Sequence, residues 1–235
     1  MRNYVIIGSC GGIGSQLIED LRSSKCNLVL GYHKNMNPRF EDLDHTQLDA
    51  ESFESVNNFI KKSKENYGHI DAIINLPGSI LLKPPHLVTE DEFDKIINVN
   101  LKTSFSAVRA AGKHLDNSSV ILISTAAVKI GLANHEAIVA SKAGIESIVK
   151  SASVTYSRKG LRFNAVAPGL VDTPLSSRII NNPASLELSK KLHITEKIGT
   201  TNDISNMIKF LIDENNSWIT GQTFRVDGGL SSTKR

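Results

Sequence analysis

The chain has 235 residues, of which 40% are hydrophobic and 22% are charged, and its 27 basic and 24 acidic residues give a formal net charge of +3. This composition is that of an ordinary globular protein, and it excludes a disordered, collagen-like or low-complexity chain. The small charge excess argues against a nucleic acid as the main partner.

Short apolar runs alternate with longer amphipathic stretches from one end of the chain to the other. The apolar runs, which predict strands, are Tyr4–Ile7, Asn27–Leu30, Ala72–Ile74, Val120–Ile123, Arg162–Val166 and Thr223–Val226. The amphipathic stretches, which predict helices, are Ser15–Arg22, Phe53–Ile60, Glu92–Val108, Ile138–Val154 and Asp203–Ile212. Several runs are continuous rather than alternating, which indicates strands that are covered on both faces. We therefore expect one α/β domain over residues 1–235, with a doubly wound parallel sheet and helices on both faces.

The largest interruption of this pattern is Leu170–Thr201, which lies between the last two predicted strands. It is polar and helical in places, so we predict that residues 170–201 form a lid over a bound ligand. The substrate itself cannot be predicted from this segment, because it has no recognisable signature.

The cysteine content and the chain ends bear on the compartment. Cys10 and Cys26 are too few for a disulfide framework, and neither has metal-ligand spacing. No apolar stretch approaches 18 residues, and the amino-terminal residues do not resemble a signal peptide. We expect a cytoplasmic protein with no metal site and no membrane segment.

A glycine-rich loop follows the first predicted strand directly. It reads Gly8-Ser9-Cys10-Gly11-Gly12-Ile13-Gly14 and opens the first predicted helix. Gly8 allows a tight turn, Gly12 allows a diphosphate to approach the backbone, and Gly14 allows the helix to pack closely on the strand. The free N–H groups at the helix start, including that of Ile13, attract an anion. A simple turn is the alternative interpretation, but the order strand, turn, helix favours a dinucleotide site.

The spacing GxxxGxG resembles the short-chain dehydrogenase/reductase family, and six further stretches match motifs of that family in order. They are Gly68–Gly78, Asn98–Leu101, Ile123–Thr125, Ser141–Gly144, Arg162–Gly169 and Ile219–Gly229. The resemblance covers nearly the whole chain. It implies a Rossmann-type fold, a nicotinamide cofactor, a small-molecule substrate and a homo-oligomer, either a dimer or a tetramer.

The expected cofactor is NADP(H) rather than NAD(H). NAD-binding sites usually have an acidic residue at the end of the second strand, whereas this chain has His33 and Lys34 there, which can meet a 2′-phosphate. Ordinary exposed loop polarity is the alternative for both residues. By resemblance, Asn75 and Gly78 flank the cofactor and Thr173 holds its nicotinamide amide. Leu76-Pro77 departs from the Asn-Ala of the family motif and removes one polar group.

The expected catalytic residues match the family only in part. By resemblance, Lys142 binds the nicotinamide ribose, Asn100 anchors a water chain, and Thr125 occupies the position of a substrate-orienting serine. The position of the proton-donating tyrosine, four residues before the lysine, is occupied by Ile138. A positioned general acid contributes about 10²–10⁴-fold in rate. The sequence therefore predicts an oxidoreductase with an altered proton-donor site.

His135 is the candidate replacement for the missing donor. Some enoyl reductases of the family place their tyrosine seven residues before the lysine, and His135 occupies that position here. Histidine exchanges protons near neutral pH. The alternatives are that His135 is a surface residue at the start of a helix, and that the protein is a catalytically silent NADP(H)-binding subunit or sensor. A carbonyl, enone or imine is the expected substrate class if the protein is an enzyme.

Overall fold

A computed structural model describes residues 1–233 and contains one parallel sheet of seven strands in the order β3-β2-β1-β4-β5-β6-β7. The strands are β1 (Arg2–Ile7), β2 (Cys26–Tyr32), β3 (Asp44–Gln47), β4 (Ala72–Asn75), β5 (Ser119–Ile123), β6 (Arg162–Pro168) and β7 (Thr223–Val226). The chain winds outward from β1 to β3 and then returns to place β4 on the other side of β1. In such sheets ligands bind beyond the carboxyl ends of the strands, near the point of reversal.

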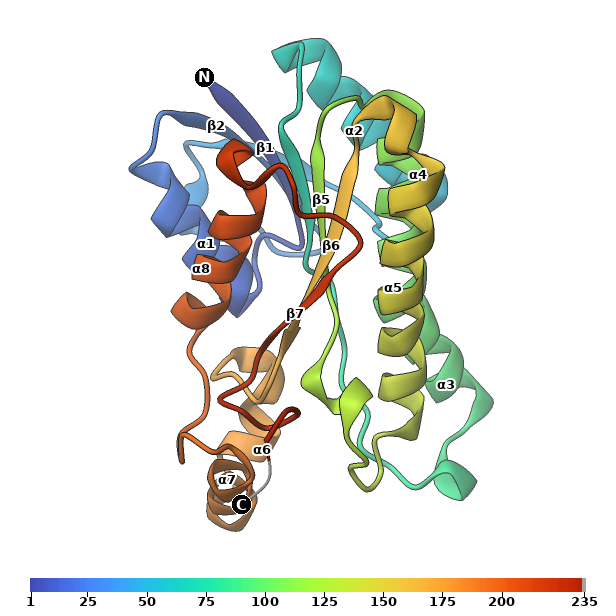
Figure 1. Ribbon diagram of the computed structural model, residues 1–235, viewed down its shortest axis with the longest axis vertical. Coiled ribbons are helices and arrows are strands. Elements are labelled where there is room, and N and C mark those ends of the chain that lie inside the picture. The colour runs from blue at the N-terminus through green and yellow to red at the C-terminus, as the bar shows by residue number, and fades with distance from the viewer. Residues whose placement is uncertain (234–235) are drawn as a thin grey trace.

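Helices cover both faces of the sheet, as the continuous apolar runs predicted. They are α1 (Gly12–Arg22), α2 (Phe53–Tyr67), α3 (Glu90–Ile96), α4 (Thr103–His114), α5 (Glu136–Thr155), α6 (Ser177–Ile180), α7 (Pro183–Leu192) and α8 (Thr201–Ile212). Figure 1 shows α1 and α8 on one face and α2, α4 and α5 on the other. Each face has its own hydrophobic core: Val5 and Ile7 of β1 enter the core beneath α2, α4 and α5, and Ile6 enters the core beneath α1 and α8.

Two elements differ from those predicted. The polar strand β3 was not expected, and it pairs with β2 alone at the edge of the sheet. The helix predicted over Glu92–Val108 begins at Glu90, where Thr89 and Glu92 form a capping box, and the helical structure continues to His114. It is interrupted between α3 and α4 by a π-helix over Ile97–Lys102, a rare conformation that often occurs at functional sites.

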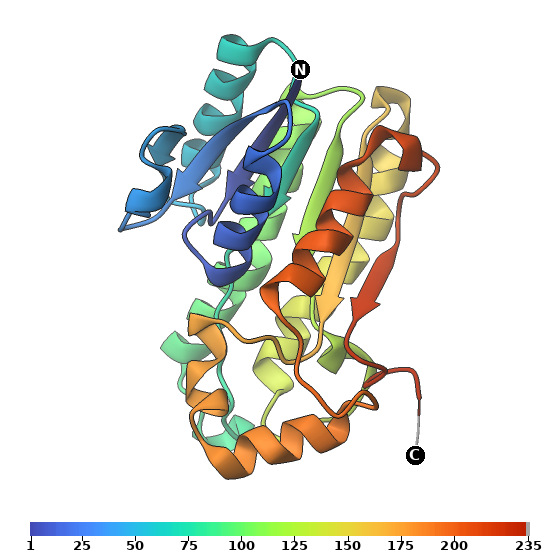
Figure 2. The same cartoon turned by 90° about the vertical axis from the view of Figure 1, so that its left-hand side faces the viewer.

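The segment 170–201 lies beyond the carboxyl ends of the strands and contains α6 and α7 (Figure 2). Its two ends pair with each other, because Gly199 N–H donates to Leu170 O and Asp172 N–H donates to Gly199 O. We call residues 170–201 the lid for this position alone; that they close over a ligand stays a prediction. Over residues 1–233, no helix has the length and apolar character required to cross a membrane.

Candidate cofactor and catalytic site

The glycine loop turns sharply from β1 into α1. Gly8 has a φ of 81°, a conformation that favours glycine, and its N–H donates to Gly31 O of the neighbouring strand. A Cβ at Gly14 would lie 2.7 Å from Ser9 O, so only glycine lets the helix approach the loop this closely. The cap residue Gly11 offers no side-chain acceptor to the first N–H groups of α1. These groups, among them the N–H of Ile13, remain available for an anion.

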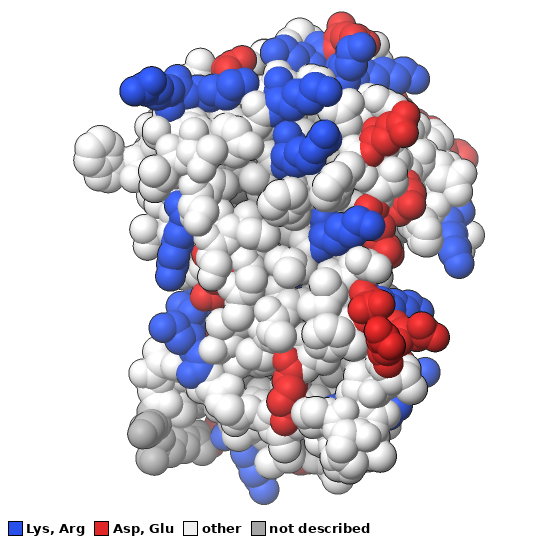
Figure 3. All heavy atoms as spheres, turned by 90° about the vertical axis from the view of Figure 1, so that its right-hand side faces the viewer, with Lys and Arg blue, Asp and Glu red and all other residues white. Residues whose placement is uncertain are grey.

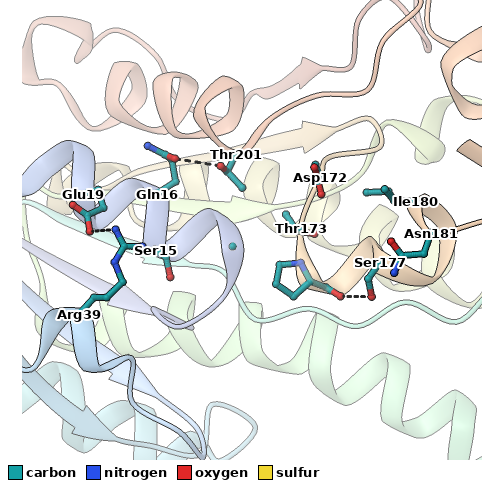
Figure 4. Close-up of a pocket in the computed structure, with 12 residues that line it drawn as sticks. Ser15, Gln16, Glu19, Arg39, Asp172, Thr173, Ser177, Ile180, Asn181 and Thr201 are labelled. Atoms are coloured by element: carbon teal, nitrogen blue, oxygen red, sulfur yellow. Dashed lines mark hydrogen bonds and ion pairs between the residues drawn. The ribbon is translucent and has the colours of Figure 1, made fainter.

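Gly12 meets the lid at this end of α1. A Cβ at Gly12 would lie 3.0 Å from Thr173 Cγ2 and 3.2 Å from Pro174 Cδ. Gly12 and Thr173, two residues expected to bind the cofactor, therefore lie against each other. They line a groove of about 550 Å³ between α1 and the lid (Figure 4).

Of the basic residues that follow β2, one lines the groove and two do not. His33 and Lys34 are exposed and are not among the residues that line the groove. Arg39, which the sequence reasoning missed, lines it and donates to Glu19 Oε1 of α1 at 2.7 Å. The turn at Asn37 brings Arg39 back to α1, because Asn37 Oδ1 accepts from Arg39 N–H and Asn37 Nδ2 donates to Ser15 Oγ. A capping Asn before Pro38 is the sequence signal that indicates this turn.

Lys142, Asn100 and Gly78 come together at the carboxyl ends of β4 and β5. A Cβ at Gly78 would lie 3.4 Å from Asn100 Oδ1 and 3.7 Å from Lys142 Nζ. Lys142 Nζ donates to Ile123 O at 2.8 Å, and burial lowers the pKa of this lysine to about 8. The Asn100 amide accepts from Ser79 N–H and donates to Ile96 O, so Asn100 ties the loop after β4 to the π-helix.

Asn75 at the end of β4 has a buried oxygen without a partner. Its Nδ2 donates to the hydroxyls of Thr103 and Ser104, which in turn donate to the carbonyls of Val99 and Asn100 in the π-helix. Because both hydroxyl protons are committed, the Asn75 amide must present N–H groups to them, and Oδ1 is left free. Oδ1 is buried and has no hydrogen-bond partner within residues 1–233. A buried acceptor of this kind is suited to a donor on a ligand.

The remaining catalytic candidates lie around the start of α5. Ile138 is 7% exposed and lies one turn before Lys142, where the family has tyrosine by resemblance. Thr125 is half-buried, and its Oγ1 accepts from Ala127 N–H at 3.3 Å. His135 is half-buried at the start of α5, with Nδ1 2.8 Å from Ala133 O. That contact leaves the other ring nitrogen, Nε2, as the one available for proton exchange.

These features fit a nicotinamide dinucleotide. The open N–H groups of α1 suit a diphosphate, and the free Asn75 Oδ1 and the ammonium of Lys142 suit amide and hydroxyl groups. No cluster of His, Cys, Asp and Glu suited to a metal ion occurs among residues 1–233. The fold is of the dinucleotide-binding type, and the groups at the strand ends suit such a ligand.

Comparisons with known proteins agree with this class. A family model described as enoyl-(acyl carrier protein) reductase matches residues 8–231, and the chain belongs to this family of short-chain dehydrogenases/reductases. The hydroxynaphthalene reductase-like protein Arp2 of Metarhizium anisopliae is 26% identical, over 96% of this chain and 93% of that protein. Glucose 1-dehydrogenase 2 of Bacillus subtilis is 25% identical, over 98% of this chain and 95% of that protein.

Solved structures show the same fold. The structure of ElxO with NADP bound has a TM-score of 0.91 and 26% identity, and the match covers 99% of both chains. The ligand-free aldohexose dehydrogenase of Thermoplasma acidophilum has a TM-score of 0.89 and 25% identity, over 99% of this chain and 95% of that one. The expected fold class is confirmed, and so is membership of the family.

Proposed function

We propose that this protein is an NADP(H)-dependent oxidoreductase that transfers hydride to a small carbonyl, enone or imine and uses a proton donor other than tyrosine. The observation that carries the proposal is the convergence of Gly78, Asn100 and Lys142 close to the glycine loop, with the apolar Ile138 at the donor position. When bound, the nicotinamide supplies or accepts the hydride. The named reductases and dehydrogenases among the relatives support this class of reaction.

The chain's own residues divide into binding and orienting groups. The loop from Gly8 to Gly14 holds the diphosphate with its N–H groups, and Asn75 and Thr173 bind the nicotinamide half. Lys142 holds the nicotinamide ribose, for which its ammonium would leave Ile123 O. Thr125 orients the substrate through its hydroxyl.

In this proposal the proton comes from His135. His135 is the residue just before α5 and is seven residues before Lys142, so the two lie about two helical turns apart. Nε2 is the ring nitrogen that would deliver the proton, since Nδ1 is engaged by Ala133 O. Activated double bonds and protonated imines suit Ile138 best, because hydride transfer to them needs no strong acid. The description of the matching family as an enoyl reductase supports this choice.

The preference for NADP(H) is supported by the basic side chains near the start of α1. Lys34 and His33 follow β2, and Arg39 reaches the groove beside Ser15. Arg39 would have to exchange its contact with Glu19 for a phosphate group, whose oxygens can accept two parallel hydrogen bonds from a guanidinium. Structures of ElxO with NADP and with NADPH show that a protein of this fold takes the phosphorylated cofactor.

The catalytically silent alternative is favoured by one observation, the buried Ile138 in place of a donor. Absorbance at 340 nm with NADPH and panels of ketones, enones and imines separates the two functions. An enzyme reduces an enone or an imine, and His135→Ala lowers that rate by about 100-fold. The exposed residue Lys102 provides the control variant, Lys102→Ala, which keeps the wild-type rate.

Two results would contradict this account. Unchanged turnover in His135→Ala overturns the assignment of the donor. NADPH binding without turnover on any panel, together with ketone reduction by Ile138→Tyr, identifies a silent cofactor-binding protein.

A further inference from the structure

A buried carboxylate lies one helical turn beyond Lys142 on the same side of α5. Glu146 is 9% exposed and follows Ile145, a residue of the hydrophobic core. Its Oε2 lies 3.4 Å from Arg225 Nη2 of β7, and its Oε1 accepts from Ser124 Oγ at 2.9 Å. The Nε of Arg225 is buried and has no hydrogen-bond partner in the described part of the chain.

Stability alone does not explain this arrangement. The desolvation cost of a buried ion pair often exceeds its electrostatic gain, and apolar residues of similar volume are frequently as stable. The incomplete pairing of Arg225 makes the balance less favourable still. A polar chain in such a place therefore points to a role in the site.

The chain of contacts leads directly to Lys142. Ser124 is 2% exposed, and besides donating to Glu146 its Oγ lies 3.4 Å from Lys142 O. The residue before it, Ile123, supplies the carbonyl that accepts from Lys142 Nζ, and the residue after it is Thr125. The position of Ser124 thus sets both the acceptor of the ammonium and the start of the turn that carries the Thr125 hydroxyl.

We propose that Glu146, held by Arg225, is a positioning residue that fixes the place of Ser124. Through the neighbours of Ser124 in the chain, Ile123 and Thr125, it thereby positions the Lys142 ammonium and the Thr125 hydroxyl. The proposal rests on the proposed function, in which Lys142 and Thr125 face the cofactor and the substrate. It concerns the placement of Lys142, which is measurable in the protein without any nucleotide.

The test is a double-mutant cycle with the variants Glu146→Gln, Arg225→Gln and their combination. The first readout is the rate at which Lys142 is acylated by N-hydroxysuccinimidyl acetate in the nucleotide-free protein, followed by peptide mass spectrometry. The second is the dissociation constant for NADPH, followed by its fluorescence. Glutamine has one acceptor oxygen in place of two, and in Glu146→Gln the Arg225 guanidinium competes with Ser124 for it. We therefore expect Glu146→Gln to accelerate acylation and weaken NADPH binding by about tenfold each, the effect of losing a hydrogen bond to a charged group. In the double variant we expect the acylation rate and the NADPH affinity to return most of the way to their wild-type values. The two introduced amides can pair with each other while the amide oxygen at position 146 still accepts from Ser124.

Two further variants distinguish the proposed positioning effect from a general effect on folding. Ser124→Ala removes the link while leaving the ion pair intact, and it should reproduce the faster acylation. Asp20→Asn is the matched control, since Asp20 accepts from Ser205 Oγ at 2.6 Å and pairs with Lys209 in a similar network between α1 and α8. It should leave both readouts at wild-type values.

The proposal is overturned if Glu146→Gln and Ser124→Ala leave acylation and NADPH binding unchanged, whatever they do to the unfolding midpoint. If the wild-type protein binds no NADPH, the proposed function fails. The acylation rates of Lys142 still decide the positioning role in that case.

Discussion

Lys142 shows how a single residue can serve the site at the expense of the fold. Its side chain is buried, its pKa is lowered to about 8 from 10.5, and its ammonium donates a hydrogen bond to Ile123 O. The shift corresponds to about 3 kcal/mol of unfavourable burial of the charged form, and one hydrogen bond returns about 1 kcal/mol. A group this costly is expected where a ligand requires it.

Lys142→Met should accordingly stabilise the protein. We expect its free energy of unfolding to exceed that of the wild type by about 2 kcal/mol at pH 7 in denaturant titrations. Because the folded-state pKa lies below the unfolded-state value, the wild type gains stability as the pH rises from about 8 to about 10.5, and the difference shrinks over that range. The exposed Lys150 on the same helix gives the control, Lys150→Met, which should change little. A destabilised Lys142→Met would contradict this description of the burial.

At the scale of the elements, the strands with apolar runs were predictable and the irregular pieces were not. The six predicted strands are present, whereas β3 was missed because Asp44-His45-Thr46-Gln47 at the sheet edge has no apolar pattern. Arg39 was missed because its approach to α1 depends on a turn. Glu146 was missed because nothing in the sequence distinguishes it from the exposed polar residues of a helix. The glycine loop was indicated by its spacing directly after a strand, and Lys142 was indicated by the resemblance to the family.

A buried histidine links two parts of the lid next to the end of β6. His193 is 3% exposed, its Nδ1 lies 2.6 Å from Ser189 O, and its Nε2 accepts from Leu170 N–H at 3.3 Å. A Cβ at Gly169 would lie 2.5 Å from Nε2, so the imidazole closes tightly over the end of β6. This side chain therefore joins the carboxyl end of α7 to Leu170, at the start of the same segment.

His193→Ala should loosen the lid. The partly buried Leu170 N–H loses its acceptor, which costs about 1 kcal/mol, and we expect faster proteolytic cleavage within residues 170–201 together with a lower unfolding midpoint. The exposed His86 provides the control variant, His86→Ala. Equal cleavage rates in His193→Ala and the wild type would show that the lid is held by other contacts.

At the scale of the whole molecule, the surface formed by α4 and α5 exposes apolar side chains to solvent. Figure 3 shows that Lys and Arg gather at one end of this face and that uncharged side chains make up much of the rest. Phe105 of α4 is 47% exposed and Val154 of α5 is 75% exposed. Apolar groups at this level of exposure suit contact with a second copy of the chain, and the expected homo-oligomer stays a prediction.

The binding of a pyridine nucleotide is the property on which the functional account depends. Its physical basis is the set of open N–H groups at the start of α1, with Arg39 beside them and the Asn75 oxygen and Lys142 at the strand ends. These groups come from segments far apart in the sequence, and the fold brings them to one end of the sheet. The fold class would stand without the cofactor, but the function would not.

Isothermal titration calorimetry of the folded protein with NADPH and NADH tests this most directly. We predict a dissociation constant for NADPH below about 1 mM, about tenfold weaker binding of NADH, and a smaller difference between the two in Arg39→Ala than in the control Lys25→Ala. The absence of heat with either nucleotide at millimolar concentration would contradict the account.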